Sequence, residues 1–195
     1  MKRQEYSSAK PKAMTLETLA LQGNTVIRGS MAATIGNRVR EIRKDLMKEC
    51  FSDFGNTEHR LETVATIHGI EFVNDSKATN INASWFALET MWKPVIWITG
   101  GLDPGNDYRG LRSLVRLKVK SIICLSTDPG RIIDTFGDLE IPIMATQSMP
   151  EAVEFSYNAG TKGDVILFSP ACPSFDLFLN YEERGAHFKM AVRNL

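Results

Sequence analysis

The stretch SIICLSTDPGRIIDTF, residues 121–136, contains the pattern that decides the fold. Its opening run, SIICLS, is apolar without alternation and rich in β-branched residues, which is typical of a strand buried on both faces of a parallel sheet. Turn-forming residues follow, and the helical spacing from Pro129 to Phe136 then predicts a helix. The stretch is therefore a candidate strand–helix unit.

The same pattern recurs through the second half of the chain. Further apolar runs are PVIWIT at 94–99, IPIMA at 141–145 and DVILFS at 164–169, and helical patterns cover Tyr108–Leu117 and Met149–Ala159. Alternation of strands and helices on this scale produces right-handed βαβ units. We therefore predict an α/β fold, with a Rossmann-like, doubly wound, mostly parallel sheet and helices on both faces.

Local signals extend the fold on both sides of these units. Two short runs, 61–67 and 70–73, flank His68-Gly69 and predict a hairpin. Helices are expected from about Asn82 to Trp92 and over a final stretch, 175–195, which is expected to be divided near Gly185.

The beginning of the chain has a different character. Residues 1–13 are polar and basic without an apolar period, which predicts a loose leader. Residues 30–50 have apolar side chains at helical spacing behind Ser30, a candidate N-cap, and predict a helix. The polar stretch FSDFGNTEH, 51–59, ends that helix and indicates a domain boundary.

Composition excludes several classes of protein. The 195 residues are 43% hydrophobic and 24% charged, as in ordinary globular proteins. Lys+Arg and Asp+Glu balance at 23 each, so no net field favours nucleic acid or a membrane surface. Three scattered cysteines (Cys50, Cys124 and Cys172) form no disulfide framework and indicate a reducing compartment. Without a signal peptide or a membrane-length apolar run, the chain is predicted to be cytoplasmic.

Three polar loops directly follow predicted strands, where doubly wound sheets bind their ligands. They are NDSKATN at 74–80, GGLDPGND at 100–107 and SPACPSFD at 169–176. The first is either a helix N-cap with solvated neighbours or a pocket for an anion. The second is either turn chemistry or a close backbone approach to a ligand. Its spacing matches neither the dinucleotide fingerprint nor the Walker lysine motif, and no Walker lysine motif occurs in the chain.

The third loop is predicted to begin a helix. Ser174 or Asp176 is the candidate N-cap, and the free N–H groups of the first turn offer an anion site. Cys172 is interpreted as a buried structural thiol rather than a nucleophile, because no histidine is visibly placed to activate it. The three histidines (His59, His68 and His187) lack metal-ligand spacing, so no metal site is predicted.

Several of these segments together resemble the Mur ligases. The matching stretches are HRLETV and GIEFVNDSKATN (59–64 and 69–80), GGLDPGNDY (100–108), SPACPSFDLFLNYEERG (169–185) and FKMAVRNL (188–195). The resemblance runs from about Met14 to the end and is strongest to the branch that adds D-glutamate to UDP-N-acetylmuramoyl-L-alanine. It implies that residues 59–195 form the carboxyl-terminal Rossmann-like domain. Residues 14–58 would be a helical remnant of the central ATPase domain.

The resemblance also implies roles for individual residues. Family members activate a carboxylate with ATP and Mg²⁺ before the incoming amine attacks it, so cations are needed where negative charge develops. Arg60 would contact phosphate, Asp75 the ribose, and Lys77 would be the catalytic cation near the phosphates. The carboxylates of D-glutamate would be held by Thr79, Ser174 and the backbone of Phe175 and Tyr181. The alternatives are that Asp75 caps a helix and that Lys77 is a solvated surface charge.

The chain also departs from the family pattern. It has no phosphate-binding P-loop, and Thr25–Gly29 lacks the two asparagines that help to hold adenine in the family. Pro104 and Leu179 stand where the family usually has lysines, and a proline supplies neither charge nor N–H. We therefore expect no tight binding of ATP or Mg²⁺, weak binding of D-glutamate, and recognition of UDP-N-acetylmuramoyl-L-alanine only with the missing domains.

Two hypotheses follow from these observations. The chain is either the amino-acid-binding part of a D-glutamate ligase, not competent for ligation by itself, or a stand-alone degenerate homologue that binds a small ligand or a partner. A Rossmann oxidoreductase is disfavoured, because no G-x-G-x-x-G follows a predicted strand.

Overall fold

The computed structural model describes residues 58–195. The predicted leader, the predicted helix at 30–50 and the boundary stretch lie outside the described residues, apart from Glu58 and His59 at its end. The division of the chain at residues 13 and 58 therefore stays a prediction.

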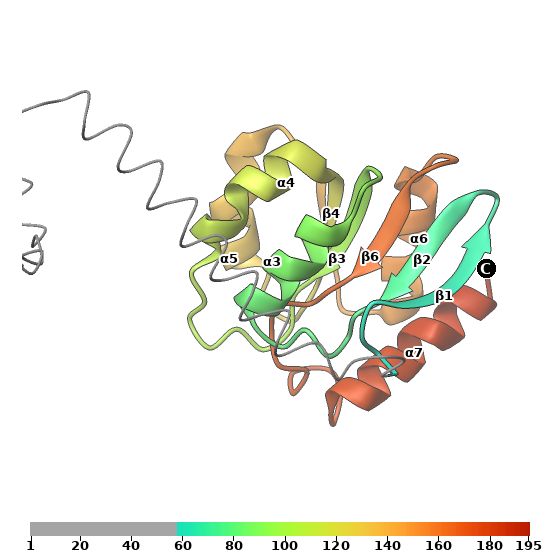
Figure 1. Cartoon of the computed structure of the whole chain (residues 1–195). Coiled ribbons are helices and arrows are strands. Elements are labelled where there is room, and N and C mark those ends of the chain that lie inside the picture. The colour runs from blue at the N-terminus through green and yellow to red at the C-terminus, as the bar shows by residue number, and fades with distance from the viewer. Residues whose placement is uncertain (1–57) are drawn as a thin grey trace, which may run out of the picture. The chain divides into compact units, whose positions relative to one another are not determined.

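Within the described part, one sheet contains every strand. The strands are β1 (Glu62–Ile67), β2 (Ile70–Asn74), β3 (Val95–Thr99), β4 (Val119–Leu125), β5 (Ile143–Thr146) and β6 (Val165–Phe168). Their order across the sheet is β1-β2-β6-β3-β4-β5 (Figure 1). The pair β1–β2 is antiparallel and all other pairs are parallel. The mostly parallel α/β sheet is thus confirmed, and the last strand in sequence lies near its middle.

Helices cover both faces of the sheet, as predicted. They are α3 (Ile81–Thr90), α4 (Arg112–Lys118), α5 (Gly130–Phe136), α6 (Met149–Ala159) and α7 (Tyr181–Arg193), with the 3₁₀ turns η1 (Tyr108–Leu111) and η2 (Gly137–Leu139). The chain moves across the sheet in one direction from β2 through β5 and returns to reach β6. Because such crossovers are right-handed, α3 and α4 lie on one face and α6 and α7 on the other (Figure 1).

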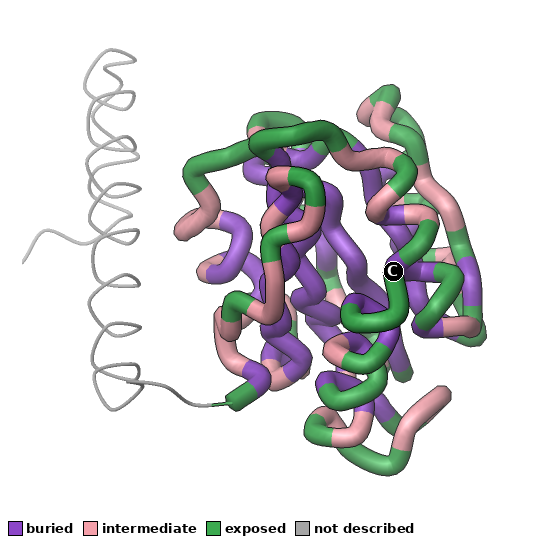
Figure 2. Tube along the Cα trace, turned by 90° about the vertical axis from the view of Figure 1, so that its right-hand side faces the viewer, coloured by how far each residue is buried: buried purple, intermediate pink, exposed green. Residues whose placement is uncertain are grey.

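Buried side chains pack on both faces of the sheet: Ile96 and Ile98 join a cluster with α6 and α7, whereas Trp97 contacts Phe136 of α5. Figure 2 shows the buried positions in the interior of the domain. Every residue of β3 is buried, which explains why its sequence is apolar without alternation. Trp97 is fully buried and donates its indole N–H to the Ser169 carbonyl at 2.8 Å. Phe168 of β6 stacks on Phe188 of α7 with ring centroids 4.9 Å apart, and this contact holds α7 against the sheet.

The predicted hairpin is confirmed. His68 and Gly69 form its turn with φ angles of 50° and 83°, the left-handed conformation that two-residue hairpin turns require. A β-carbon at Gly69 would lie 2.7 Å from Cγ of Lys162. The positive φ angle and this close contact both disfavour a larger residue here.

The final helix differs from the prediction in both its start and its continuity. Residues 174–180 form turns and bends, and α7 begins at Tyr181 because Asn180 accepts the Glu183 N–H at 2.7 Å as its N-cap. The helix continues through Gly185 without a break. The glycine reflects a packing requirement, since a β-carbon there would lie 2.2 Å from Nδ1 of His59.

Candidate functional site at the carboxyl edge of the sheet

Strand β6 creates the topological switch points of the fold. Its neighbours β2 and β3 lead to helices on one face, whereas β6 leads to α7 on the other. Connections that diverge in this way open a place for a ligand at the carboxyl ends of the strands. The segments after these strands, residues 74–80, 100–107 and 169–180, are called the three-loop edge below.

Backbone hydrogen bonds hold the three loops together. The Asp75 N–H donates to the Phe168 carbonyl at 2.8 Å, and the Gly100 N–H donates to Pro170 at 2.9 Å. The Leu102 N–H donates to Pro173 at 3.1 Å. Residues 70 to 93 positions apart in sequence are therefore bonded at one edge, as the strand pattern predicted.

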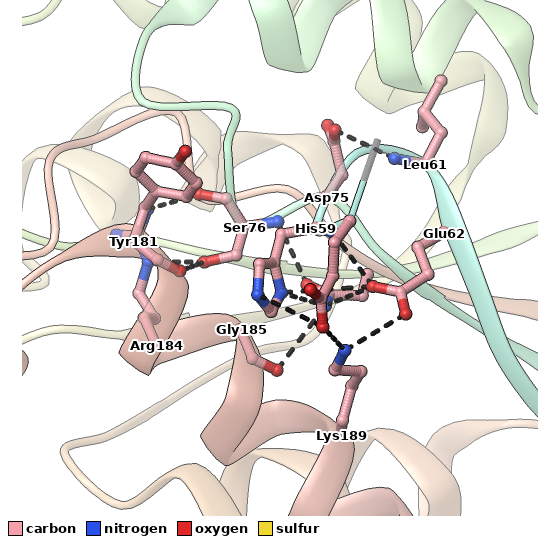
Figure 3. Close-up of polar contacts among 11 residues, drawn as sticks. His59, Leu61, Glu62, Asp75, Ser76, Tyr181, Arg184, Gly185 and Lys189 are labelled. Atoms are coloured by element: carbon pink, nitrogen blue, oxygen red, sulfur yellow. Dashed lines mark hydrogen bonds and ion pairs between the residues drawn. The ribbon is translucent and has the colours of Figure 1, made fainter. Parts of the chain in front are cut away.

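Arg184 of α7 is the strongest link between the first and third loops. It is 1% exposed, and it donates to the hydroxyl and the carbonyl of Ser76 at 3.2 and 2.8 Å and to the Cys172 carbonyl at 3.0 Å. Burial lowers the pKa of the guanidinium to about 10, so it keeps its charge at neutral pH. The Ser76 hydroxyl in turn donates to the Tyr181 carbonyl at 2.7 Å (Figure 3).

The second loop also closes against this arginine. Gly101 has a φ of 139°, and a β-carbon there would lie 2.4 Å from the Pro173 carbonyl and 3.2 Å from Arg184 Nη1. Glycine is therefore required for the close approach. Sequence reasoning missed Arg184, because charge patterns do not reveal a buried arginine whose partners are carbonyls and a hydroxyl. Its position in the NYEERG motif was the available signal.

Thr79 and Ser174 bring hydroxyls to the edge that remain free to bind. Ser174 is 2% exposed, and among residues 58–195 neither side-chain hydroxyl forms a hydrogen bond. The Ser174 carbonyl accepts the N–H groups of Leu177 and Phe178, which closes one isolated turn rather than a helix. The predicted helix N-terminus at Ser174 is therefore wrong. The start of α7 at Tyr181 supplies the free helical N–H groups instead.

Asp75 is more deeply buried than the resemblance suggested, at 5% exposure. Its carboxylate accepts the Leu61 N–H at 3.3 Å and the Ser169 hydroxyl at 2.8 Å. Burial raises the pKa of Asp75 to about 7, against the lowering effects of these hydrogen bonds and of the Arg60 charge. The alternative in which Asp75 caps a helix is wrong, because Asn80 caps α3 by accepting the Ala83 N–H at 3.0 Å.

Lys77 lies between the first loop and α7. It is partly buried, and its ammonium stands 5.8 Å from the ring centroid of Tyr181. This places a cation beside the N-terminus of α7. Phe175 is 69% exposed on the turn after Ser174, and Leu179 is 79% exposed near its end.

A second polar cluster anchors the chain where β1 begins (Figure 3). The His59 N–H donates to Glu62 at 3.0 Å, and the Asn74 amide lies 2.9 Å from His59 Nδ1. Because an amide nitrogen donates, Nδ1 of the ring is the acceptor in this pair. Lys189 of α7 bonds Glu62 at 3.2 Å. This cluster fixes Arg60, which follows His59, beside Asp75.

The second loop shows the turn chemistry that its sequence predicted, and its approach to a ligand stays a prediction. Asp103 Oδ1 accepts the N–H groups of Gly105 and Asn106 at 2.8 and 2.7 Å, which is turn chemistry. The Asn106 amide then donates to the Ala171 carbonyl at 3.1 Å, so the turn also positions the third loop.

The interpretation of Cys172 as a structural thiol is confirmed. Its Sγ lies 2.9 Å from the Tyr108 hydroxyl, and burial raises the pKa of the thiol. A thiol in this state is a poor nucleophile. Cys124 is equally buried, and burial raises its thiol pKa to about 12.

Two other kinds of feature are absent from residues 58–195. Within the described residues, no group of three or more His, Cys, Asp or Glu side chains is arranged to hold a metal ion. None of the helices in that part of the chain is long and apolar enough to cross a membrane.

A hollow of about 390 Å³ lies at the carboxyl ends of β4 and β5, beside the three-loop edge, because Ser126 and Thr127 of its lining are hydrogen-bonded to Gly101 and Asp176. Sequence reasoning did not predict it. It is lined by Ser126, Thr127, Pro129, Ala145, Thr146, Gln147 and Glu151.

Comparison with known proteins points to one family. A protein-family model described as "Mur ligase, glutamate ligase domain" matches residues 59–172. The chain is 48% identical over 182 residues to the UDP-N-acetylmuramoylalanine–D-glutamate ligase of Christiangramia forsetii. It is 44% identical over 185 residues to the enzyme of the same name from Porphyromonas gingivalis. These alignments cover 93% and 95% of the chain, which spans about 41% of the length of each relative.

A solved structure of lower similarity is the UDP-N-acetylmuramate-alanine ligase of Thermotoga maritima. It aligns with a TM-score of 0.49 and 15% identity over 75% of the chain and 32% of that structure.

Proposed function

The chain belongs to the Mur ligase family, and on this premise we propose that it is the amino-acid-binding part of a ligase that adds D-glutamate to UDP-N-acetylmuramoyl-L-alanine in peptidoglycan synthesis. The relatives at 41–48% identity carry the name of that activity. The family model matches residues 59–172, which contain the first two loops of the three-loop edge and the start of the third.

The observation that carries this proposal is the pair of available hydroxyls on Thr79 and Ser174. Both residues sit on loops whose backbones bond Arg184, and neither side-chain hydroxyl has a hydrogen-bond partner among residues 58–195. A small dicarboxylate presents four acceptor oxygens at the ends of a short chain. Hydroxyls and the free N–H groups at the start of α7 are the donors that such a ligand needs.

The remaining proposed roles concern charge. We assign Lys77 as the catalytic cation near the phosphates, where negative charge develops, and its ammonium stands beside Tyr181 at the start of α7. The backbone of Phe175 and Tyr181 is proposed to complete the carboxylate contacts. These groups bind and orient D-glutamate so that its amine reaches the activated carboxylate of the second substrate.

ATP, when bound to a complete ligase, supplies the phosphoryl group that activates this carboxylate. The residues of this chain that fit the nucleotide are Arg60, for a phosphate, and Asp75, for the ribose. The fit at Asp75 is constrained, since its oxygens already accept from Leu61 and Ser169. With no P-loop in the sequence and no metal-binding cluster among the described residues, the chain is proposed not to perform ligation by itself.

The second candidate is a stand-alone homologue that binds a small ligand or a partner without catalysis. Pro104 favours it, because this exposed position of the second loop supplies no charge to a ligand. Under both candidates the buried, unpaired Cys124 and Cys172 accord with a reducing compartment, and we place the protein in the cytoplasm.

Titration of the ¹⁵N-labelled chain with D-glutamate, followed by NMR, tests the proposal. We expect saturable shifts at the three-loop edge with a Kd in the millimolar range, about −4 kcal/mol of binding free energy. Thr79→Val and Ser174→Ala should each weaken binding several-fold, and L-glutamate should bind more weakly than D-glutamate. Shifts that never saturate, or that map to another part of the domain, would contradict the proposed function.

A further inference from the structure

Arg131 occupies a position that is electrostatically unfavourable in its own helix. It lies in the first turn of α5, where the positive end of the helix disfavours positive charge. Its side chain is 59% exposed, and Nε stands 3.8 Å from Asp103 Oδ2, beyond hydrogen-bond distance. Within the described part of the chain the guanidinium makes no hydrogen bond. Five donors are therefore available at this point of the surface.

Asp103 is the complementary half of this arrangement. Its Oδ1 is fixed by the N–H groups of Gly105 and Asn106. Its Oδ2 is buried and has no hydrogen-bond partner among the described residues. A buried carboxylate oxygen without a donor is costly, and a small movement of Arg131 would satisfy it through Nε. The guanidinium already lies along this loop, with Nη2 4.0 Å from the position of a β-carbon at Gly105.

Hydrogen bonds join the segments that carry this pair to the third loop. The loop that holds Asp103 is bound to the third loop through Leu102 and Pro173, the residue before Ser174. The segment that leads into α5 contacts the same region, since the Thr127 N–H lies 3.4 Å from the Asp176 carboxylate. Arg131 thus lies beside the second loop, which is itself bonded to the part of the third loop that carries Ser174. Lys77 borders the three-loop edge at the first loop.

A dicarboxylate bound at this edge needs a cation for each end. Arg184 does not serve, because it is buried and its nitrogens donate to Ser76 and Cys172. We infer that Arg131 is the second carboxylate-binding residue of the site, with Nε on Asp103 and both Nη groups forked on one carboxylate of the ligand. This inference rests on the proposed function. In this inference, helix α5 supplies the positive charge that Pro104 of the second loop lacks.

The test compares Arg131→Met and Arg131→Lys with the wild-type chain by NMR titration. Arg116→Met is the matched control, because it removes an exposed arginine from the adjacent helix α4. The probes are D-glutamate, D-glutamine and D-isoglutamine, and each amide lacks one of the two carboxylates. Loss of a charge-assisted contact at a partly exposed site predicts about tenfold weaker D-glutamate binding in Arg131→Met. Arg131→Lys should recover part of the loss, since it keeps the charge without the fork.

The amides identify the contact. If Arg131 binds one carboxylate, the effect of Arg131→Met should disappear with the amide that lacks that carboxylate and persist with the other. Equal binding by Arg131→Met and Arg116→Met would overturn this inference and leave the proposed function standing. Absence of saturable D-glutamate binding to the wild-type chain would overturn both.

Discussion

Replacing Arg184 by methionine tests whether one buried side chain sets the spacing of the binding loops. Methionine has a similar length but no donors, so the Ser76 and Cys172 carbonyls lose their partners inside the protein. Each unpaired buried carbonyl costs about 1–3 kcal/mol. Removal of a buried charge offsets part of this cost, because the guanidinium no longer needs to be desolvated. We expect a net loss of about 2–4 kcal/mol of unfolding free energy.

A loss of that size corresponds to a fall of roughly 8–16 °C in Tm for a domain of this length. Differential scanning calorimetry measures it, and D-glutamate titration reports whether Thr79 and Ser174 still act together. Arg184→Lys keeps a charge but replaces the planar fork with a single ammonium, so its stability should be intermediate. Arg193→Met, on the exposed last turn of the same helix, is the control and should change Tm by no more than about 2 °C. If Arg184→Met matched this control in both Tm and D-glutamate binding, the hydrogen bonds of Arg184 would not set the spacing of the binding loops.

Three further predictions concern other parts of the structure. Gly185→Ala should destabilise the domain by about 1–3 kcal/mol in urea unfolding, because its β-carbon meets the His59 ring; an unchanged midpoint would show that the ring moves freely. The pKa of Asp75 is raised to about 7 in the folded state, so the folded protein binds the extra proton. The stability from this group should be complete below pH 4 and lost as pH rises through 7; Asp75→Asn should remove this dependence, and parallel curves for both proteins would contradict it. Calorimetric titration should detect no ATP binding tighter than about millimolar, and micromolar saturation would show that other residues replace the P-loop.

The architecture was predictable because parallel strands leave a strong sequence signal. Runs such as PVIWIT and DVILFS are apolar at every position, since both faces are covered, and the structure places each in the sheet. The rule that ligands bind at the carboxyl ends of parallel strands then predicted correctly that the three loops share one edge, without knowledge of any side-chain position. The hairpin turn at His68-Gly69 was also predictable, because its conformation depends on the local sequence alone.

Details that depend on packing between distant segments were not predictable. The last helix was predicted to begin near Ser174, because serine and aspartate are good N-caps. In the structure Asn180, six residues later, is the N-cap of α7. Gly185 suggested a break, but its small size makes room for His59, 126 residues away. Arg184 and Arg131 were overlooked for related reasons. The contacts of each arginine are made with residues that the sheet order, rather than the sequence, brings close.

The central position of β6 also determines when this domain can complete its fold. β6 is the last strand to leave the ribosome, yet it pairs with both β2 and β3. Until residue 168 has emerged, the hairpin β1–β2 and the half-sheet β3–β4–β5 have no strand to join them, and each presents an unpaired edge. These contacts span about 70 to 100 residues, so the final step is an insertion with a large loop-closure cost. Nascent or truncated chains that stop before Val165 would therefore expose the unpaired edges of β2 and β3. We expect shortened forms of this protein to aggregate through these edges.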